Sequence, residues 1–429
     1  MEKGPLHAGA RRDPAMRPNR PIIGRAKCSP TGPLGLYLHW PYCTTKCGYC
    51  DFYSVPQGDA DLSRTARALC QELSLRLAGA GPQVRTVFFG GGTPTTMAAP
   101  LLAEVLAAIH EAVTSDAPVE FTVEANPATV DAAKAQVLRD CGVDRISLGA
   151  QSFHHAELAF LERLHDPADI PEAVRVLRDG GIANINLDLI FGVPGQTLAS
   201  WRESLLRALA LGPQHLACYG LTYEPNTALT QRLRQGAITP CDDGFEAEQY
   251  ALAIEVLAEA GFEHYEISNF ALPGRRCAHN LIYWHNAPYL AVGPSASGFT
   301  GTERYKNIAQ HGEYVRRVEA GEDPAADHEE VGRATVALET LMMGMRLVEG
   351  FDLAEFAGRT GYDLRILAAE RLASMQTQGL AEIRGETLVL TRRGLLLADG
   401  IIAELAMALD ERPGLALPVV RTSRPVKGQ

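Results

Sequence analysis

The sequence GLYLHWPYCTTKCGYCDF (residues 35–52) joins a short apolar run to three cysteines at spacings of four and three residues. Cys43, Cys47 and Cys50 provide three thiols, and Phe52 stands where a fourth thiol two residues later would complete the set. Iron–sulfur clusters are bound by cysteine thiolates, normally four for a four-iron cubane. Three thiolates would leave one iron open to an exchangeable ligand, so the stretch predicts a [4Fe-4S] cluster with one open iron.

The competing interpretation of these cysteines is a structural zinc site, or no site at all. A structural zinc site has four ligands, and no second pair of cysteines follows at a suitable spacing. The chain has nine cysteines among 429 residues, an odd number at low density, which argues against a secreted disulfide framework. The sequence therefore favours a cluster in a reducing compartment, the cytoplasm.

The apolar run before the cysteines is the first of six that alternate with helix-like segments. The six runs are residues 35–40, 85–90, 120–125, 145–150, 185–192 and 215–222, and the helix-like segments are 60–79, 97–114, 129–140, 155–179 and 198–210. Runs this apolar suit parallel strands buried on both faces, and βα repetition implies right-handed crossovers. Six strand–helix units are two fewer than the eight that form a closed TIM barrel. The sequence therefore predicts an α/β fold with a partial (β/α)6 TIM-type barrel.

Changes in composition divide the chain into five expected parts. Residues 1–33 are rich in Pro, Gly and Arg and are expected to be disordered. Residues 34–260 are expected to form the barrel. Residues 261–328 are expected to bridge the barrel and the last domain, with an irregular structure over 262–310. Residues 329–412 combine helices with a hairpin that turns at Gly385, which resembles a winged-helix module. Residues 413–429 are expected to be a loose tail.

The charge and hydropathy of the chain limit its partners. The net charge of −11 repels phosphate backbones, so no nucleic-acid partner is expected, and DNA binding by the winged-helix-like part is disfavoured. No apolar run reaches the roughly eighteen residues that a membrane span needs. A peripheral contact with a membrane stays open.

Several polar residues sit where buried strands end. Gly91 and Gly92 follow the second strand, where glycines let the backbone approach a ligand, although a tight βα turn alone would also use them. Glu124 and Asp188 lie among apolar strand residues and need a partner, either a nearby arginine or a bound ligand.

The order of motifs along the chain resembles a known family. C-x3-C-x2-C preceded by YLHWPY resembles the radical SAM superfamily, and FFGGGTPT, VEANP, LGAQSF, ERLH, NLDLIFGVPGQT and HNLIYW follow in the order of oxygen-independent coproporphyrinogen III oxidase and its relative HemW. The resemblance covers nearly all of the chain after residue 34. It implies that the open iron binds S-adenosylmethionine, and that the nucleoside contacts are Tyr37, Tyr49, Gly91, Gly92, Thr93, Glu124, Gln151, Arg163 and Asp188.

Two departures separate this chain from the oxidase pattern. The oxidase has a further cysteine two residues past the third, where HemW-type sequences and this chain have Phe. The oxidase also has a longer N-terminal segment that encloses its active site, whereas the corresponding stretch here reads as a disordered tail. Both differences favour the HemW-type interpretation.

A second block of residues resembles a haem-binding motif of HemW-type proteins. His279, Asn280, Tyr283 and Trp284 form H-N-x-x-Y-W, in which a neutral imidazole is able to ligate haem iron and the aromatic rings offer flat faces. The alternative is a packed loop in which the histidine is satisfied by hydrogen bonds. Rival iron ligands near the motif are Cys277, His285, His264 and Tyr265.

The HemW-type resemblance implies a haem chaperone that transfers haem to respiratory haem proteins. This transfer could take place at the inner face of the membrane, and the chaperone could be a homodimer. No catalytic residue is assigned. The alternative is an enzyme, a coproporphyrinogen III oxidase or another radical SAM protein that uses a 5′-deoxyadenosyl radical.

Overall fold

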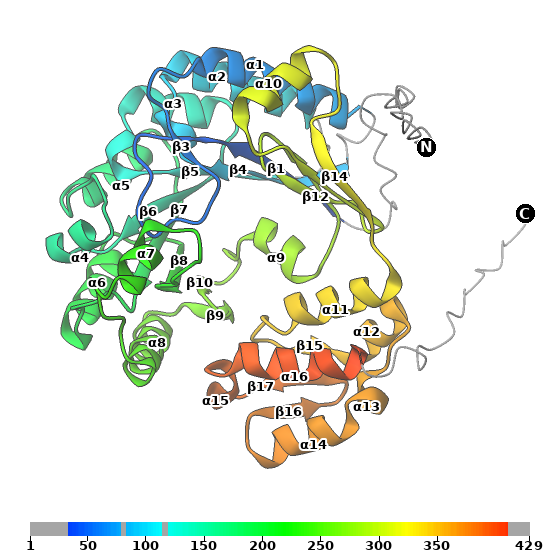
Figure 1. The fold of residues 1–429 in the computed structure, drawn as a ribbon. Coiled ribbons are helices and arrows are strands. Elements are labelled where there is room, and N and C mark those ends of the chain that lie inside the picture. The colour runs from blue at the N-terminus through cyan, green and yellow to red at the C-terminus, as the bar shows by residue number, and fades with distance from the viewer. Residues whose placement is uncertain (1–32, 79–82, 114–118, 411–429) are drawn as a thin grey trace, which may run out of the picture.

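The computed structural model describes residues 33–78, 83–113 and 119–410, and the expected tails 1–33 and 413–429 lie outside these residues except for Pro33. Six parallel strands form the centre of a twelve-stranded sheet (Figure 1). They are β1 (Leu34–Trp40), β4 (Val84–Gly91), β5 (Glu120–Ala125), β6 (Arg145–Gln151), β7 (Asn184–Phe191) and β8 (His215–Gly220), adjacent in that order. The predicted partial barrel is confirmed, and the strand at Tyr289–Val292 adds a seventh parallel strand beside β1.

Helices connect these strands and cover the outer face of the sheet (Figure 1). They are α1 (Leu62–Arg76), α2 (Ala99–Ala112), α3 (Ala132–Asp140), α4 (His155–Phe160), α5 (Asp169–Asp179) and α6 (Leu198–Ala210). The segment 155–179, expected as one helical stretch, is two helices. Glu162 adopts a positive φ of 55° between them, and Pro167 lacks the amide hydrogen that a continuous helix would use.

Alternation along the strands separates an apolar outer face from a polar inner face. Ile146 and Leu148 of β6 belong to the main apolar core beneath the helices. Ser147, which lies between them on the strand, points the other way and donates a hydrogen bond to Asp188 of β7 at 3.2 Å. The inner face of the partial barrel is therefore where the polar side chains of neighbouring strands meet.

The bridging region is more ordered than expected. Strands β9 (Glu263–Glu266) and β10 (Asn269–Ala271) extend the sheet beyond β8, while β11 (Tyr289–Val292), β12 (Ser297–Phe299), β13 (Glu303–Asn307) and β14 (Ala325–Glu330) extend it beyond β1. The expectation that 262–310 is irregular is wrong, because short strands without long apolar runs pair with an existing sheet edge. Helix α9 (Ala278–Trp284) and helix α10 (His311–Glu319) complete the region, and the domain boundaries at 260 and 328 stay predictions.

The last domain has its own apolar core. Its elements are α11 (Arg333–Gly344), β15 (Phe351–Asp352), α12 (Leu353–Thr360), α13 (Leu364–Leu367), α14 (Ala369–Thr377), β16 (Ala381–Arg384), β17 (Thr387–Leu390), α15 (Arg392–Leu395) and α16 (Ala398–Asp410). Gly385 turns the β16–β17 hairpin with a φ of 64°, as predicted. The barrel also carries α7 (Ala228–Arg234), α8 (Asp243–Glu259) and the short pair β2 (Tyr42–Cys43) and β3 (Val55–Pro56). No helix within the described ranges is long and apolar enough to cross a membrane.

Candidate functional site

The three cysteines lie on one loop at the carboxyl end of β1. Strands β2 and β3 pair in parallel and close the base of this loop, with Cys43 opposite Pro56. The amide of Cys50 donates a hydrogen bond to the carbonyl of Cys47 at 3.2 Å, which turns the chain between these two cysteines. All three side chains are half-buried and unpaired by disulfides.

The electrostatics of the loop oppose free thiolates. Burial, together with the smaller effects of the nearby thiols of Cys47 and Cys43, raises the pKa of Cys50 to about 11. Burial also raises the pKa of Cys43. Bound metal supplies the positive charge that makes such thiols deprotonate, so this donor set fits an iron–sulfur cluster.

No three His, Cys, Asp or Glu side chains of the described residues converge on the position of a single metal ion. In a cubane the thiolates bind separate iron atoms rather than one centre. Phe52, at the position of the absent fourth cysteine, is 69% exposed and provides no ligand atom.

Two predicted nucleoside contacts touch the cysteines directly. The hydroxyl of Thr93 lies 3.6 Å from the sulfur of Cys43, and Nη1 of Arg163 lies 3.5 Å from the sulfur of Cys47. Thr93 follows β4, and Arg163 lies on the loop between α4 and α5. The fold therefore brings residues from two crossovers to the cysteine loop.

The glycine triplet packs against β1 and β5 without space for side chains. A Cβ on Gly90 would lie 2.4 Å from a carboxylate oxygen of Glu124, and one on Gly92 would lie 2.4 Å from the carbonyl oxygen of Tyr42. The amide of Gly91 donates to Glu124 at 3.0 Å, and the amide of Gly92 donates to the carbonyl of Trp40 at 2.6 Å. Both amides therefore have partners within the protein, which accounts for a tight turn.

Glu124 of β5 and Asp188 of β7 are carboxylates on strands that flank β6, and their charges interact. Burial, together with the smaller effect of the charge of Asp188, raises the pKa of Glu124 to about 7. Asp188 accepts hydrogen bonds from Asn186 at 2.8 Å and from Ser147 at 3.2 Å, and its pKa is also raised by burial. Two such carboxylates fit a cationic ligand, such as an ammonium or sulfonium group, that would relieve their repulsion.

His39 is a site residue that the sequence reasoning missed. Its Nε2 lies 2.7 Å from the carbonyl oxygen of Tyr53, and its Nδ1 lies 2.9 Å from the hydroxyl of Tyr37. Burial lowers the pKa of His39 to about 4, so the ring is neutral near pH 7. Because a carbonyl only accepts, Nε2 carries the proton and Nδ1 accepts from Tyr37. The Tyr37 oxygen can then accept a further hydrogen bond. The only sign in the sequence that His39 belongs to the site is its position as a polar residue inside an apolar run.

The remaining nucleoside contacts lie at the end of β6 and in the cysteine loop. Gln151 ends β6 with a φ of 65°, a conformation that costs free energy and that occurs more often at functional sites than elsewhere. Arg163 donates to the carbonyl of Gly149 at 2.9 Å, and its buried Nε has no hydrogen-bond partner among the described residues. An orphaned donor of this kind fits a ligand at this position. Tyr49 is half-buried and packs against a small apolar cluster that includes Ile190.

The predicted haem motif forms α9, which lies at the opposite end of the inner face. The carboxylate of Glu120 accepts from the amides of Ala278 and His279 at 2.9 and 3.0 Å and so anchors the start of the helix. His279 is fully buried, with Nδ1 2.8 Å from the hydroxyl of Thr86 and Nε2 2.9 Å from the hydroxyl of Tyr283. Both ring nitrogens are engaged, as the packed-loop alternative requires.

The other motif residues and the rival ligands differ in exposure. Trp284 is half-buried, with an indole nitrogen that has no partner in the described chain, and the guanidinium of Arg346 lies 5.8 Å from its ring centre. His285 is exposed. Asn280 is half-buried, Cys277 and Tyr265 are buried, and His264 contacts the carbonyl of Ile267 at 3.1 Å.

The haem motif and the nucleoside residues share one aromatic contact. The ring of Phe88 on β4 lies 6.3 Å from that of Tyr37, stacked, and 5.3 Å from that of His279. The two predicted ligand sites are therefore separated by a single side chain.

Comparison with known proteins finds similar sequences over most of the chain. The profile of the Radical SAM superfamily matches residues 37–208, and that of the HemN C-terminal domain matches residues 332–397. The chain is 36% identical over 380 residues to the haem chaperone HemW of Mycobacterium tuberculosis, covering 88% of this chain and 95% of the relative. It is 34% identical to HemW of Escherichia coli over 77% of this chain and 86% of the relative.

A solved structure shows the same fold. Coproporphyrinogen III oxidase (HemN) from Escherichia coli, a radical SAM enzyme, superposes with a TM-score of 0.76 at 22% identity, covering 90% of this chain and 92% of that chain.

Proposed function

Since this chain belongs to the HemW family of the radical SAM superfamily, we propose that it is a haem chaperone that binds haem together with a [4Fe-4S] cluster and S-adenosylmethionine. Haem is passed on to acceptor haem proteins. The observation that carries the proposal is the cysteine loop, in which three grouped cysteines are followed by the exposed, non-ligating Phe52.

The cluster and the nucleoside would be held by residues already in contact. Cys43, Cys47 and Cys50 would provide three thiolates, while Thr93 and Arg163 would border them. When bound, a reduced cluster supplies one electron to S-adenosylmethionine. Glu124 and Asp188 would balance the positive charge of the nucleoside, and Gln151, Tyr37, Tyr49, Gly91 and Gly92 would orient it.

Haem would bind at α9 through His279, Asn280, Tyr283 and Trp284. Ligation of iron by His279 requires its imidazole to give up its contact with either Thr86 or Tyr283. Each such hydrogen bond contributes about 1 kcal/mol net, so the expected binding is reversible, as transfer to an acceptor demands. His285 is the exposed rival ligand one residue beyond the motif.

A second candidate function is an oxygen-independent coproporphyrinogen III oxidase. It is favoured by one observation: the residues that would contact the nucleoside are all grouped on the inner face and beside the cysteines. The absence of a cysteine at position 52 weighs against it.

The cellular setting is proposed on chemistry alone. Respiratory haem proteins at the inner face of the membrane are the proposed acceptors, with the chaperone in the cytoplasm, where thiols stay reduced. A homodimer is a further proposal.

The proposed function is tested by haem binding and transfer. Titration of the full chain with haemin, followed by absorbance, should saturate at one haem per chain. Mixing the loaded protein with an apo-b-type cytochrome should move the Soret absorbance to that of the acceptor. A chain that binds haemin only nonspecifically, without saturation, would contradict the proposal.

A further inference from the structure

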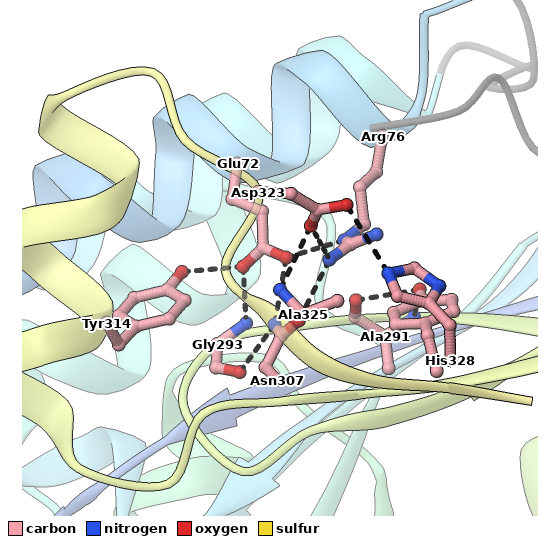
Figure 2. A network of polar contacts seen from close by, with 10 residues as sticks. Glu72, Arg76, Ala291, Gly293, Asn307, Tyr314, Asp323, Ala325 and His328 are labelled. Atoms are coloured by element: carbon pink, nitrogen blue, oxygen red, sulfur yellow. Dashed lines mark hydrogen bonds and ion pairs between the residues drawn. The ribbon is translucent and has the colours of Figure 1, made fainter. Parts of the chain in front are cut away.

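A buried polar network lies on α1 and the strands beside β1, outside the inner face of the barrel (Figure 2). Its centre is Glu72, a carboxylate with 0% exposure. This carboxylate accepts hydrogen bonds from Nε of Arg76 at 2.5 Å, the hydroxyl of Tyr314 at 2.7 Å, Nδ2 of Asn307 at 2.8 Å and the amide of Gly293 at 2.9 Å. The four donors come from four different segments of the chain.

The charge of Glu72 is paired with that of Arg76, as a buried carboxylate requires. The network reaches the surface at one point, where the guanidinium of Arg76 lies 3.8 Å from the carboxylate of Asp323, whose side chain is 29% exposed. Arg76 also donates to Oδ1 of Asn307 at 2.8 Å, and its guanidinium stacks 4.2 Å from the ring centre of Tyr305. Asn307 donates from Nδ2 to the carbonyl of Gly293 at 2.8 Å. Gly293 is therefore held by both its amide and its carbonyl.

Gly293 in turn lies in close contact with the end of β1. It has a φ of 105°, and a Cβ at this position would lie 2.3 Å from the carbonyl oxygen of His39. Strand β11 pairs with β1 as far as Val292 opposite Leu38, so Gly293 is the next residue after the ladder ends. The Glu72 network therefore holds a residue that lies directly against the backbone of His39.

His39 connects this backbone contact to the candidate site. A Cβ on Gly91 would lie 2.5 Å from the His39 ring, so the ring and the glycine turn are in close contact. The same ring bonds the hydroxyl of Tyr37 and the carbonyl of Tyr53, where the cysteine loop returns to the sheet. A shift of His39 would therefore move the glycine turn, Tyr37 and the end of the loop together.

We propose that Glu72 is a positioning residue for the nucleoside and cluster site, and that it acts through the backbone contact of Gly293 with His39. This inference rests on the proposed binding of a cluster and S-adenosylmethionine. It goes beyond that binding by assigning a role to a carboxylate of α1, outside the inner face of the barrel.

A second contact between α1 and α10 provides a matched control, because its loss would weaken the packing of these two helices without touching the Glu72 network. Arg64 of α1 and Glu319 of α10 form an ion pair at 2.6 Å, with side chains 49% and 41% exposed. This pair links the same two helices as the contact of Glu72 with Tyr314, but it lies on the exposed surface rather than in the buried network around Gly293. Exposed pairs contribute little to stability.

The test uses full-length, anaerobically reconstituted protein and two variants, Glu72→Gln and Gly293→Ala. The amide of Gln has the size of the carboxylate, but its NH2 group replaces an oxygen that accepts from two donors. The Ala methyl would displace the His39 carbonyl. Both variants should still assemble the cluster. Both should bind S-adenosylmethionine about ten-fold more weakly, measured from the change that it causes in the electron paramagnetic resonance spectrum of the reduced cluster. Glu319→Gln should behave as wild type, and the double variant should lose no more than either single one.

Three outcomes decide between the alternatives. Wild-type nucleoside affinity and spectra in both folded variants would overturn the positioning role alone. Loss of the fold in both variants, seen as melting temperatures far below that of Glu319→Gln, would show that the Glu72 network only stabilises the fold. This result would also overturn the positioning role. A wild-type cluster that does not respond to S-adenosylmethionine would contradict the proposed cofactor binding itself.

Discussion

Nη1 of Arg163 lies 3.5 Å from the sulfur of Cys47, so a predicted nucleoside contact and a predicted cluster ligand are in direct contact. Strands β4, β5 and β6 lie between the two residues in sequence, and only the pairing of these strands with β1 in one sheet brings them together. The arginine places a positive charge beside a thiol that a cluster would deprotonate.

Removal of this charge should change the redox properties of the cluster. Arg163→Met is expected to lower the reduction potential by on the order of tens of millivolts, because a nearby positive charge stabilises the reduced, more negative cluster. A redox titration followed by electron paramagnetic resonance measures the shift. Arg163→Lys keeps the charge and should shift the potential less; equal potentials in wild type and Arg163→Met would refute the electrostatic role.

Loss of one cysteine of the loop should abolish the cluster. Cys47→Ser is expected to lose the iron–sulfur absorbance after anaerobic reconstitution, because two remaining thiolates do not hold a cubane. Cys241→Ser is the matched control, since Cys241 is also half-buried but lies outside the loop. A cluster spectrum that survives in Cys47→Ser would show that the assignment is wrong.

Binding of the nucleoside should depend on pH through Glu124. Burial and Asp188 raise the pKa of Glu124 from 4.5 to about 7, so in ligand-free protein the free energy of unfolding falls as pH rises through that window. A cationic ligand favours the ionised carboxylate, so affinity for S-adenosylmethionine should rise as pH increases through about 7. Calorimetric titration at about pH 6 and about pH 8 measures this.

Glu124→Gln serves as the control for this pH dependence. It removes the titrating group and should bind the nucleoside weakly at both pH values. A steep dependence that persists in Glu124→Gln would assign the effect to another group, such as Glu266, whose pKa burial also raises to about 7.

Haem binding should respond in opposite directions to two substitutions at α9. His279→Ala should weaken haem binding or shift the Soret band, because it removes the proposed iron ligand. Thr86→Val should strengthen binding by up to about five-fold, since ligation no longer has to break a hydrogen bond worth about 1 kcal/mol. Absorbance titration with haemin measures both affinities.

His285→Ala is the control for the rival ligand and should bind haem as wild type does. An unaltered spectrum and affinity in His279→Ala, with loss in His285→Ala, would move the iron ligand to the exposed histidine at the end of α9.

The central strands were predictable because their physical signal is strong. Strands such as β6 and β7 are buried almost throughout and carry an apolar residue at every second position, so they stand out from the helical segments around them. The cysteine loop was predictable because three closely spaced thiols directly after a buried strand are typical of a cluster site. Neither inference needed contacts between distant residues.

The outer strands were not predictable for the opposite reason. Strand β14 has the sequence AADHEE and is largely exposed, so only its pairing with β13 makes it a strand. The engagement of His279 with Thr86 was equally invisible, because it joins residues from α9 and β4 through the fold. The role of His39 depends on its contacts with Tyr53, Gly91 and Gly293, which no local pattern encodes.

A single preparation is enough to separate a haem chaperone from an oxidase. Anaerobically reconstituted protein is divided, and one half is titrated with haemin while the other is reduced and supplied with S-adenosylmethionine and coproporphyrinogen III. For a chaperone we expect saturable, stoichiometric haem binding and no protoporphyrinogen. Catalytic formation of protoporphyrinogen with 5′-deoxyadenosine would contradict the proposed function and identify the chain as an oxidase that works without a cysteine at position 52.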